Sequence, residues 1–405
     1  MAYACRHCGS VLGDSDTVID LGHQPPSNSY LTTEQLAMPE VTYPLKVYVC
    51  PNCWLVQLPA HASAEELFTA DYAYFSSTSS SWCAHAEQFV TLAVERLDLD
   101  LTSHVVELAS NDGYLLQYFK KKGISCLGIE PTHATAEAAR GKGIETIECF
   151  FGLSLAEQLE PADLVVANNV LAHVPDINDF VAGIARLLKI NGRASIEFPH
   201  LLRLLIGNQF DTIYHEHYSY LSLRIVQRIA HAKGMDVVDV EELPTHGGSL
   251  RVWLAHKGIA EPTASVLAIL HAEAEIGLEQ HSAYSNFQTR AERAKFKLLQ
   301  FLLDAKRQGK RVLGYGAAAK GNTLLNYTGV HADLLEYVGD LAISKQNKFL
   351  PGSHIPVISP EQLAAQKFDS LLVLPWNLID EVTEQFPHKE LVTAIPDLRF
   401  CSKQV

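Results

Sequence analysis

The chain has 405 residues, a length that corresponds to two or three domains. Hydrophobic residues make up 47% and charged residues 19%, a composition that excludes an intrinsically disordered chain. The formal net charge is −14 and no long basic run occurs, which argues against a protein that reads a nucleic-acid backbone. A small anionic ligand, held by a few local cations and dipoles, stays compatible with this charge.

The cellular compartment is the next property that the composition bounds. The sequence has no run of 18 apolar residues, and its N-terminus lacks the apolar core of a secretion signal. We therefore expect a cytoplasmic protein. In a reducing compartment, the eight cysteines need an explanation other than disulfide bonds.

Four of the cysteines form two CxxC pairs, Cys5/Cys8 and Cys50/Cys53, with 41 residues between the pairs. Each pair places two thiolates on one side of a tight turn, and four thiolates together form the tetrahedral cage that zinc prefers. Such a site is closed and structural, because the protein supplies every ligand. Two unrelated thiol pairs and a redox dithiol are the alternatives. We predict a zinc-binding module over residues 1–70.

A serine-rich segment follows this module. Residues 76–81 are five serines and one threonine, and they come directly after an aromatic stretch that contains Tyr72 and Tyr74. A flexible linker and a polar loop over an active site explain this composition equally well. The apolar spacing over residues 81–97 then predicts a helix.

The central part of the chain alternates predicted strands with predicted helices. We expect strands at 104–109, 126–130, 163–167 and 194–197, and helices at 114–122, at 134–142 and after Pro175. This alternation predicts an α/β fold in which a doubly wound parallel sheet binds its ligand at the carboxyl ends of the strands.

Two features of this sheet concern the ligand. The first turn, Glu107-Leu-Ala-Ser-Asn-Asp-Gly113, lacks the three glycines with which a dinucleotide fold approaches a pyrophosphate. Glu130 ends the second strand about 20 residues later, at the position where a carboxylate holds a ribose diol. S-adenosylmethionine contains a ribose and no phosphate, so it fits both features. A plain strand–turn–helix unit without a cofactor is the alternative.

Residues 211–220 hold the densest cluster of proton-active side chains. If this segment were a strand, Tyr214, Glu216 and Tyr218 would share one face, and a helix or turn would break that division. His215 and His217 would then lie on the opposite face. A metal site and a hydrogen-bonded core cluster are the alternatives to a catalytic role.

The C-terminal part begins with a second α/β pattern. Residues 310–323 predict a strand, a Gly/Ala-rich turn and a helix start, where backbone amides and Lys320 would face an anion. A purely structural turn is nearly as compatible with this pattern. Strands predicted at 336–340 and 370–374 complete the layer, and the charged, Ala-rich segment 256–309 is expected to be a helical connector.

Several motifs, taken in order, resemble those of the sugar C-methyltransferases over essentially the whole chain. They are the two CxxC pairs, the turn at 107–113, Asn168-Asn-Val-Leu-Ala-His173, Tyr214-His-Glu-His217 and His246-Gly-Gly-Ser249. The resemblance implies an S-adenosylmethionine-binding domain over residues 71–255 and a C-terminal Rossmann-like domain over 310–405 that helps to hold a nucleotide-linked sugar.

The implied reaction is methylation at C3 of a nucleotide-linked 4-keto-6-deoxy sugar. The ketone at C4 makes the C3 proton acidic, because its removal gives an enolate. The resemblance implies that His217 is the base, that Tyr214 and Glu216 orient it and contact the sugar, and that His173 donates a hydrogen bond to the enolate oxygen. The implied partner is a small molecule, with no nucleic acid and no membrane, and the chain is expected to be a monomer.

The remaining predicted site residues fall into two groups. The expected cofactor-binding residues are Glu107, Ala109, Ser110, Asn111, Gly113, Glu130, Pro131, Asn168 and Asn169. The expected substrate-binding residues are Tyr72, Tyr74, His246, Gly247, Arg251 and Lys320. For Arg251, both a phosphate and a carboxylate partner fit the chemistry of a guanidinium.

Two other functions compete with this prediction. An NAD-linked nucleotide-sugar oxidoreductase or epimerase would use the C-terminal Gly-rich turn, but the turn at 107–113 lacks a pyrophosphate site. A zinc-containing binding protein without catalysis would not need the combined set of Glu130, His173, Tyr214, Glu216 and His217.

Overall fold

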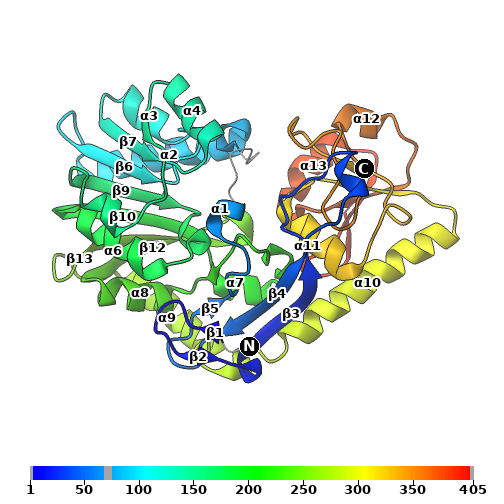
Figure 1. Cartoon of the computed structure of the whole chain (residues 1–405), viewed down its shortest axis with the longest axis horizontal. Coiled ribbons are helices and arrows are strands. Elements are labelled where there is room, and N and C mark those ends of the chain that lie inside the picture. The colour runs from blue at the N-terminus through cyan, green and yellow to red at the C-terminus, as the bar shows by residue number, and fades with distance from the viewer. Residues whose placement is uncertain (1–2, 68–74, 402–405) are drawn as a thin grey trace.

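The computed structural model describes residues 3–67 and 75–401. Two α/β lobes lie side by side, and the N-terminal strands β3 and β4 lie between them (Figure 1). The predicted α/β class, with a zinc module, a central doubly wound sheet and a second Rossmann-like sheet, is confirmed. In the described residues no helix is long and apolar enough to cross a membrane.

The N-terminal module consists of a short hairpin and a four-stranded sheet. Its elements are β1 (Tyr3–Ala4), β2 (Val11–Leu12), β3 (Thr17–Gln24), β4 (Tyr43–Val49), β5 (Val56–Gln57) and α1 (Ala64–Leu67). The sheet order is β11-β5-β4-β3, and β11 (Ser219–Tyr220) comes from a distant part of the chain. One CxxC pair lies inside the β1–β2 hairpin, and the other joins β4 to β5.

The central sheet has the order β12-β13-β10-β9-β6-β7-β8. Its strands are β6 (His104–Leu108), β7 (Ser125–Ile129), β8 (Glu145–Ile147), β9 (Ala162–Asn168), β10 (Leu188–Pro199), β12 (Met235–Leu243) and β13 (Ser249–His256). The neighbouring strands β10, β9, β6, β7 and β8 pair in parallel in that order. The strand β13 pairs antiparallel with both β10 and β12. The strands predicted at 104–109, 126–130, 163–167 and 194–197 correspond to β6, β7, β9 and β10.

Helices cover both faces of this sheet. They are α2 (Ser80–Leu97), α3 (Leu116–Lys121), α4 (His133–Gly141), α5 (Leu153–Ala156), α6 (Ile177–Leu187) and α8 (Leu223–Ala232). The short helix α7 (Leu201–Ile206) instead buries its leucines in the apolar core that β3 and β4 share with the C-terminal lobe. Neighbouring strand residues point to opposite faces. Val105 accordingly packs in the cluster of α2 and α3, and Val106 packs in the cluster that contains α6, α8 and the cysteine pairs. Burial on both faces explains the continuous apolar runs of the sequence.

Two helices lead from the central sheet to the C-terminal lobe. The first, α9 (Ala264–Ile276), packs on α8 and β12, so it extends the layer of the central lobe. The second, α10 (Phe287–Arg307), runs below the C-terminal lobe in Figure 1 and contacts β3 and α11. The predicted helical connector therefore forms two helices that belong to different layers.

The C-terminal sheet has the order β16-β15-β14-β17-β18-β19, in which all neighbours are parallel except the last pair. Its elements are β14 (Val312–Tyr315), α11 (Ala319–Thr328), β15 (Val338–Gly339), β16 (Val357–Ile358), α12 (Pro360–Ala364), β17 (Ser370–Val373), α13 (Ile379–Gln385), β18 (Glu390–Thr393) and β19 (Arg399–Cys401). One apolar core joins β3 and β4 to α10, α11 and this sheet.

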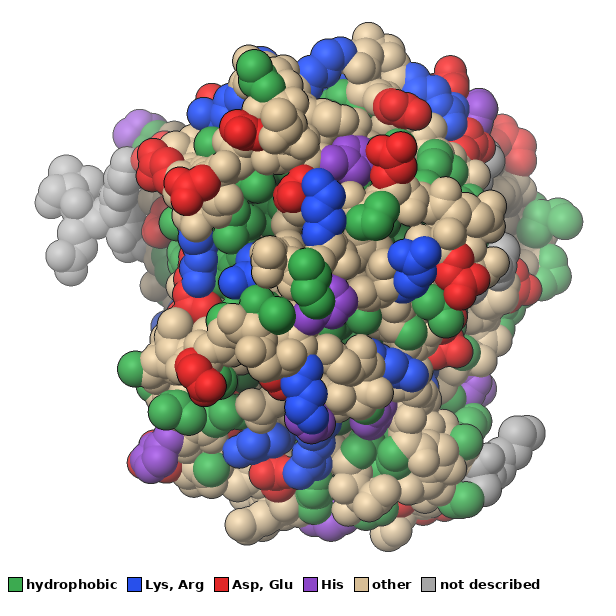
Figure 2. All heavy atoms as spheres, turned by 90° about the vertical axis from the view of Figure 1, so that its left-hand side faces the viewer, with side chains coloured by type: hydrophobic (Ala, Val, Ile, Leu, Met, Phe, Trp, Pro, Cys, Tyr) green, Lys and Arg blue, Asp and Glu red, His purple; other side chains and the backbone are tan. Residues whose placement is uncertain are grey.

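Charges of both signs are interspersed over the face of the molecule that Figure 2 shows, and no continuous basic stripe crosses it. This view agrees with the net charge of −14. Binding of an anion must therefore depend on a few local groups.

Candidate active site

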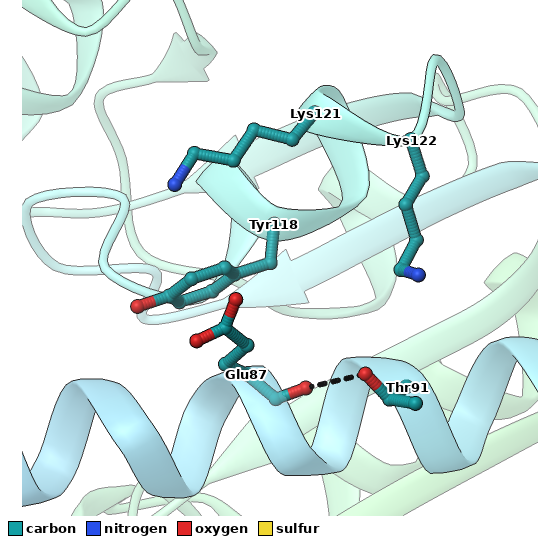
Figure 3. Close-up of a pocket in the computed structure, with 5 residues that line it drawn as sticks. All are labelled: Glu87, Thr91, Tyr118, Lys121 and Lys122. Atoms are coloured by element: carbon teal, nitrogen blue, oxygen red, sulfur yellow. Dashed lines mark hydrogen bonds between the residues drawn. The ribbon is translucent and has the colours of Figure 1, made fainter.

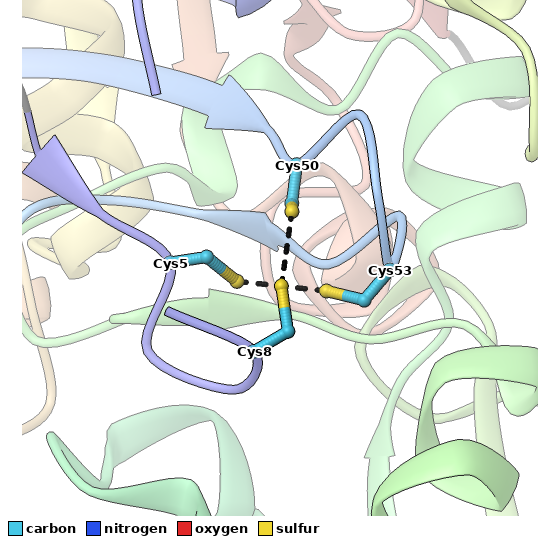
Figure 4. A group of neighbouring side chains, drawn as sticks. All are labelled: Cys5, Cys8, Cys50 and Cys53. Atoms are coloured by element: carbon cyan, nitrogen blue, oxygen red, sulfur yellow. Dashed lines mark hydrogen bonds between the residues drawn. The ribbon is translucent and has the colours of Figure 1, made fainter. Parts of the chain in front are cut away.

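The sulfur atoms of Cys5, Cys8, Cys50 and Cys53 all lie within 4.8 Å of one another (Figure 4). The two CxxC turns have the same backbone design, because the residue after each pair, Gly9 or Trp54, is left-handed and donates its N–H to the carbonyl of the pair's first cysteine. Four soft thiolates from two rigid turns are the donor set that zinc prefers, and they leave no position for a substrate. The residues present therefore fit a structural zinc ion.

A cavity of about 550 Å³ lies at the carboxyl ends of β6, β7 and β9 and reaches the first turn of α11. This volume is within the range of roughly 300–1,000 Å³ that is common for small-molecule sites. All three parts of the chain contribute to its wall, since Asn28, Glu130 and Lys320 line it.

The turn after β6 forms one end of the cavity. Ala109 and Asn111 both line the cavity and have positive φ angles of 54° and 51°. The N–H of Asn111 donates to Glu130 Oε2 at 2.9 Å, and the N–H of Thr132 donates to Glu130 Oε1 at 2.9 Å. These amides fix the carboxylate of Glu130 at the cavity wall, where its remaining lone pairs suit a ribose diol.

Two asparagines at the end of β9 supply unsatisfied polar atoms. Asn168 and Asn169 line the cavity, and the left-handed Asn169 has a φ of 53°. Asn168 Oδ1 and both amide atoms of Asn169 are buried without a hydrogen-bond partner among the described residues. Buried polar groups are rarely left unpaired, so these atoms indicate a bound ligand with hydroxyl or ammonium groups. S-adenosylmethionine carries both hydroxyl groups and an ammonium group.

His217 lies in a turn, not in a strand. Its N–H donates to the carbonyl of Tyr214 at 2.9 Å, so of the alternatives for this segment the structure has the turn, and the division into two strand faces does not apply. The turn brings the rings of Tyr214 and His217 together, with centroids 3.9 Å apart, and both line the cavity. The strand β11 begins only at Ser219, where it pairs with β5.

The tautomer of His217 follows from one hydrogen bond. Its Nδ1 lies 2.8 Å from the carbonyl oxygen of Thr212, and a carbonyl can only accept, so Nδ1 carries the proton. Nε2 therefore keeps its lone pair. Burial, together with His173, lowers the pKa of His217 well below its usual range. The ring is thus a neutral acceptor at neutral pH.

His173 completes this part of the cavity. Its ring centroid lies 4.6 Å from that of His217, and it lines the same wall. Burial lowers the pKa of His173 to about 4, so this ring is also neutral. Two neutral imidazoles side by side can serve as an acceptor and a donor.

Two other residues of the cluster at 211–220, Glu216 and His215, do not line the cavity. Glu216 is buried and accepts a hydrogen bond from Asn28 Nδ2 at 3.1 Å, and burial raises the pKa of Glu216 to about 7. His215 packs against Tyr43 of β4, with ring centroids 5.8 Å apart. Neither residue lines the cavity, although Asn28 does. The structure therefore places Glu216 one hydrogen bond away from the wall.

The C-terminal lobe closes the opposite side of the cavity. Ala318, Ala319 and Lys320 line it at the start of α11, and Lys345 lines it from the loop after β15. Lys320 Nζ donates to Asn377 Oδ1 at 2.8 Å and lies 4.7 Å from the ring of Trp376. Burial lowers the pKa of Lys320, and the nearby carboxylate of Asp211 opposes this. A cation and helix amides at one end of a cavity suit an anionic group.

Comparison with known proteins is decisive for the family. The chain is 35% identical to C-methyltransferase NovU of Streptomyces niveus over 385 residues, which cover 94% of this chain and 91% of that protein. The chain belongs to the C-methyltransferase family. Three family models match consecutive parts: "Putative zinc binding domain" over residues 5–68, "Methyltransferase domain" over 82–240, and "C-methyltransferase C-terminal domain" over 244–395.

Solved structures overlap with less than half of this C-methyltransferase. The PH0226 protein of Pyrococcus horikoshii has a TM-score of 0.39 and 16% identity, and the match covers 46% of this chain and 95% of that chain. Magnesium protoporphyrin IX methyltransferase of Synechocystis, solved with bound S-adenosylhomocysteine, has a TM-score of 0.35 and 15% identity, with 43% and 83% covered.

The enzyme's cofactors follow from the family and from the residues present. The methyltransferase domain uses S-adenosylmethionine, and the four cysteines are the zinc site. Membership in this family excludes the competing predictions of an oxidoreductase and of a non-catalytic binding protein.

The structure brings only some of the predicted cofactor residues to the cavity. Ala109, Asn111, Glu130, Pro131 and both asparagines line it. Glu107, Ser110 and Gly113 lie behind the wall. Burial and the carboxylates of Asp112 and Glu130 raise the pKa of Glu107 well above its usual range. Ser110 fills the space over Gly128, where a Cβ would lie 2.5 Å from its Oγ.

Some of the predicted substrate-binding residues line the cavity, and others do not. His246, which has a φ of 53°, lines the cavity together with Lys320. Gly247 and Arg251 do not line it. Arg251 pairs with Glu197 at 3.0 Å and with Glu241 at 3.1 Å, so its guanidinium has carboxylate partners inside the protein. Tyr72 and Tyr74 lie outside the described residues.

The wall contains further residues that sequence reasoning missed, and three of them come from separate parts of the chain. Asn28 comes from the N-terminal module, Trp82 from the first turn of α2, and Thr212 from the turn before His217. Asn28 follows two prolines and a serine, so its turn composition was the available signal. No local pattern marks Trp82, whose spacing predicted a core position.

A second hollow, of about 170 Å³, lies between α2 and α3 (Figure 3). Glu87, Thr91, Tyr118, Lys121 and Lys122 line it. The side chains of the two lysines extend from its rim, and it contains none of the fully buried polar groups that characterise the larger cavity. It therefore does not compete as an active site.

Proposed function

We propose that this C-methyltransferase methylates C3 of a nucleotide-linked 4-keto-6-deoxy sugar through an enolate, in deoxysugar biosynthesis. The observation that supports this most is the fixed tautomer of His217. Its Nε2 lone pair belongs to a ring that lines the same cavity as Glu130 and Lys320. One cavity therefore combines a neutral base with a carboxylate suited to a ribose and a cation suited to a diphosphate.

The chemistry requires a base, a stabilised oxyanion and a methyl donor. S-adenosylmethionine, when bound, supplies an electrophilic methyl group. His217 Nε2 takes the proton from C3, and the electron pair of the C–H bond moves into the enolate. A hydrogen bond from neutral His173 to the oxygen on C4 stabilises this anion, a contribution that typically amounts to a few kcal/mol. With the methyl donor bound, the enolate pair would form the new C3–C bond while the S–CH3 bond breaks and its electron pair stays on sulfur, which gives S-adenosylhomocysteine. The proton stays on His217.

The nucleotide is proposed to extend toward the C-terminal lobe. Lys320, Lys345 and the free amides at the start of α11 would meet its diphosphate. This arrangement explains how an acidic chain holds an anionic substrate through a few groups. The predicted regions 1–70, 71–255, 256–309 and 310–405 would then contribute zinc binding, methyl transfer, connection and nucleotide binding. We place the enzyme in the cytoplasm, as a monomer.

The test is incubation with isotope-labelled S-adenosylmethionine and a panel of nucleotide-linked 4-keto-6-deoxy sugars, analysed by mass spectrometry and NMR. We expect one labelled methyl group on C3. A methyl group on oxygen or nitrogen would contradict the enolate mechanism.

The catalytic role of His217 is tested by His217→Asn. This variant should bind S-adenosylmethionine normally in calorimetry and lose at least about 100-fold in kcat, the contribution of a general base. His271→Asn is the matched control, because the side chain of His271 is 74% exposed and pairs only with Glu275 of its own helix. Undiminished turnover by His217→Asn would move the base to another residue.

A further inference from the structure

Arg6 stands between the two cysteines of the first zinc turn, and its side chain points away from the metal site. Its guanidinium donates from Nη1 to the carbonyl of Pro175 at 2.6 Å and from Nη2 to the carbonyl of Leu58 at 2.5 Å. The guanidinium carbon also lies 5.2 Å from the ring centroid of Tyr218. These three contacts belong to three separate segments of the chain.

Two of these segments carry the histidines of the cavity. Pro175 is two residues beyond His173, and Tyr218 directly follows His217. The side chain of Arg6 thus links the backbone near His173 to Tyr218, the residue after His217. The rings of the two histidines approach to 4.6 Å, so a small displacement of either segment would change their geometry.

The same zinc turn has further contacts with both segments. Asn178, four residues beyond Val174, donates from Nδ2 to the carbonyls of Arg6 and His7 at 3.1 and 2.9 Å. On the other side, the N–H of Leu58 donates to the carbonyl of Tyr218 at 3.0 Å, and Leu58 in turn accepts from Arg6. The zinc turn is therefore bonded to the wall behind each histidine.

The charge and the planar shape of the guanidinium strengthen these contacts, and the side chain of Arg6 is only partly buried. A charged donor to a carbonyl is stronger than a neutral one, and the planar fork fixes two carbonyls in one geometry. Methionine has a similar length and no donor, and lysine has the charge without the fork.

We propose that Arg6 is a positioning residue, which holds the segments of His173 and His217 at the separation that deprotonation at C3 requires. This role rests on the proposed function, because it acts through the two histidines. It assigns the zinc module a part in catalysis, since the module supplies the residue that sets the geometry of the base.

The test uses the full-length, zinc-loaded enzyme with Arg6→Met and Arg6→Lys. We expect Arg6→Met to lower kcat by about 10- to 100-fold, because misplacement by about 1 Å has effects of this size. Zinc content should stay at one ion per chain, and the KM values should change by less than about threefold. Arg6→Lys should recover part of kcat. The exchange of the C3 hydrogen with deuterated solvent, measured with S-adenosylhomocysteine, should slow in parallel.

Arg228→Met is the matched control. Arg228 touches the other zinc turn, since its Nη1 donates to the carbonyl of Cys53 at 2.9 Å, and within residues 3–67 and 75–401 its hydrogen bonds and ion pairs join it to Cys53 and Glu279 and to neither histidine segment. Kinetics of Arg6→Met equal to those of Arg228→Met would overturn the proposal. If Arg6→Met loses zinc, Arg6→Lys decides, because full kcat and exchange in a zinc-loaded lysine variant also overturn it.

A double variant separates this proposal from the proposed function. If Arg6 acts through His217, Arg6→Met should cause no further loss in the His217→Asn background. An additional 10-fold loss there would assign Arg6 a different role. If wild-type enzyme shows no exchange at C3 with any keto sugar, the proposed function itself fails, and the imidazole NMR signals of His173 and His217 still report whether Arg6→Met moves them.

Discussion

Two neighbouring residues of the turn at His217 have pKa values that are shifted in opposite directions by the same cause. Burial lowers the pKa of His217 and raises that of Glu216 to about 7. In both cases the low-dielectric surroundings disfavour the charged form. The imidazole of His217 is thereby kept neutral. The ionised carboxylate of Glu216 lowers the free energy of unfolding above neutral pH.

This shift predicts a pH-dependent gain in stability for Glu216→Gln. The carboxyl group titrates near pH 4.5 in the unfolded chain and near 7 in the folded one, so wild type loses stability as the pH rises through this window. The variant has no such loss and should unfold with a free energy up to about 3 kcal/mol higher at pH 8, with little difference near pH 4. Urea denaturation at both pH values measures this.

Glu157→Gln, at an exposed position, is the control and should behave as wild type at both pH values. A Glu216→Gln variant that is less stable than wild type at pH 8 would show that the carboxylate is favourably solvated or paired.

At the scale of elements, the end of β10 joins three segments around the cavity. Glu197 is fully buried and lies 2.9 Å from His85 of α2, 3.0 Å from Arg251 of β13 and 3.1 Å from the hydroxyl of Thr245. The helix α2 also carries Trp82, whose ring lies 5.3 Å from that of His246. The carboxylate of Glu197 therefore anchors the segments that carry the wall residues Trp82 and His246.

Removal of this carboxylate should be strongly destabilising. Glu197→Ala leaves the buried guanidinium of Arg251 with Glu241 as its remaining carboxylate partner, and the loss of a buried ion-pair partner typically costs about 3–5 kcal/mol. Chemical denaturation should detect this difference directly. Glu242→Ala, which removes an ion pair with Arg203 that is about half exposed, should cost less than about 1 kcal/mol. Equal effects of the two substitutions would refute the role of Glu197.

At the scale of the whole molecule, the zinc module is built into both lobes. Its sheet includes β11, which begins two residues after His217, and its strands β3 and β4 share an apolar core with the C-terminal lobe. Loss of zinc therefore affects more than the first 70 residues. Without the metal ion, the bonds that hold the two CxxC turns together are absent, so the module cannot keep its geometry.

Zinc removal should accordingly abolish methyl transfer and lower the melting temperature. A chelator with a thiol-reactive reagent should release one zinc ion per chain, detected by the absorbance of a metal indicator, and calorimetry should follow the loss of stability. A chelator saturated with zinc beforehand is the control. Full activity of a zinc-free chain would show that the module folds without its metal.

The sequence by itself determined several features that depend on near neighbours. The spacing of Cys5/Cys8 and Cys50/Cys53, the strand–turn–helix around Gly113 and the carboxylate at Glu130 are local patterns, and the fold and the cofactors predicted from them are confirmed. Periodicity and turn chemistry act over a few residues, so they can be read without knowledge of the packing.

Only the tertiary structure decided which side chains meet. Arg251 is directed into an ion-pair network and Asn28 into the cavity, and the segment around His217, which the sequence left open between strand, helix and turn, forms a turn. Segments far apart in the chain meet in the same buried space and decide these positions. The contact of Arg6 with Pro175 spans 169 residues. The free energy that selects such contacts comes from burial in the assembled fold, and no local pattern contains it.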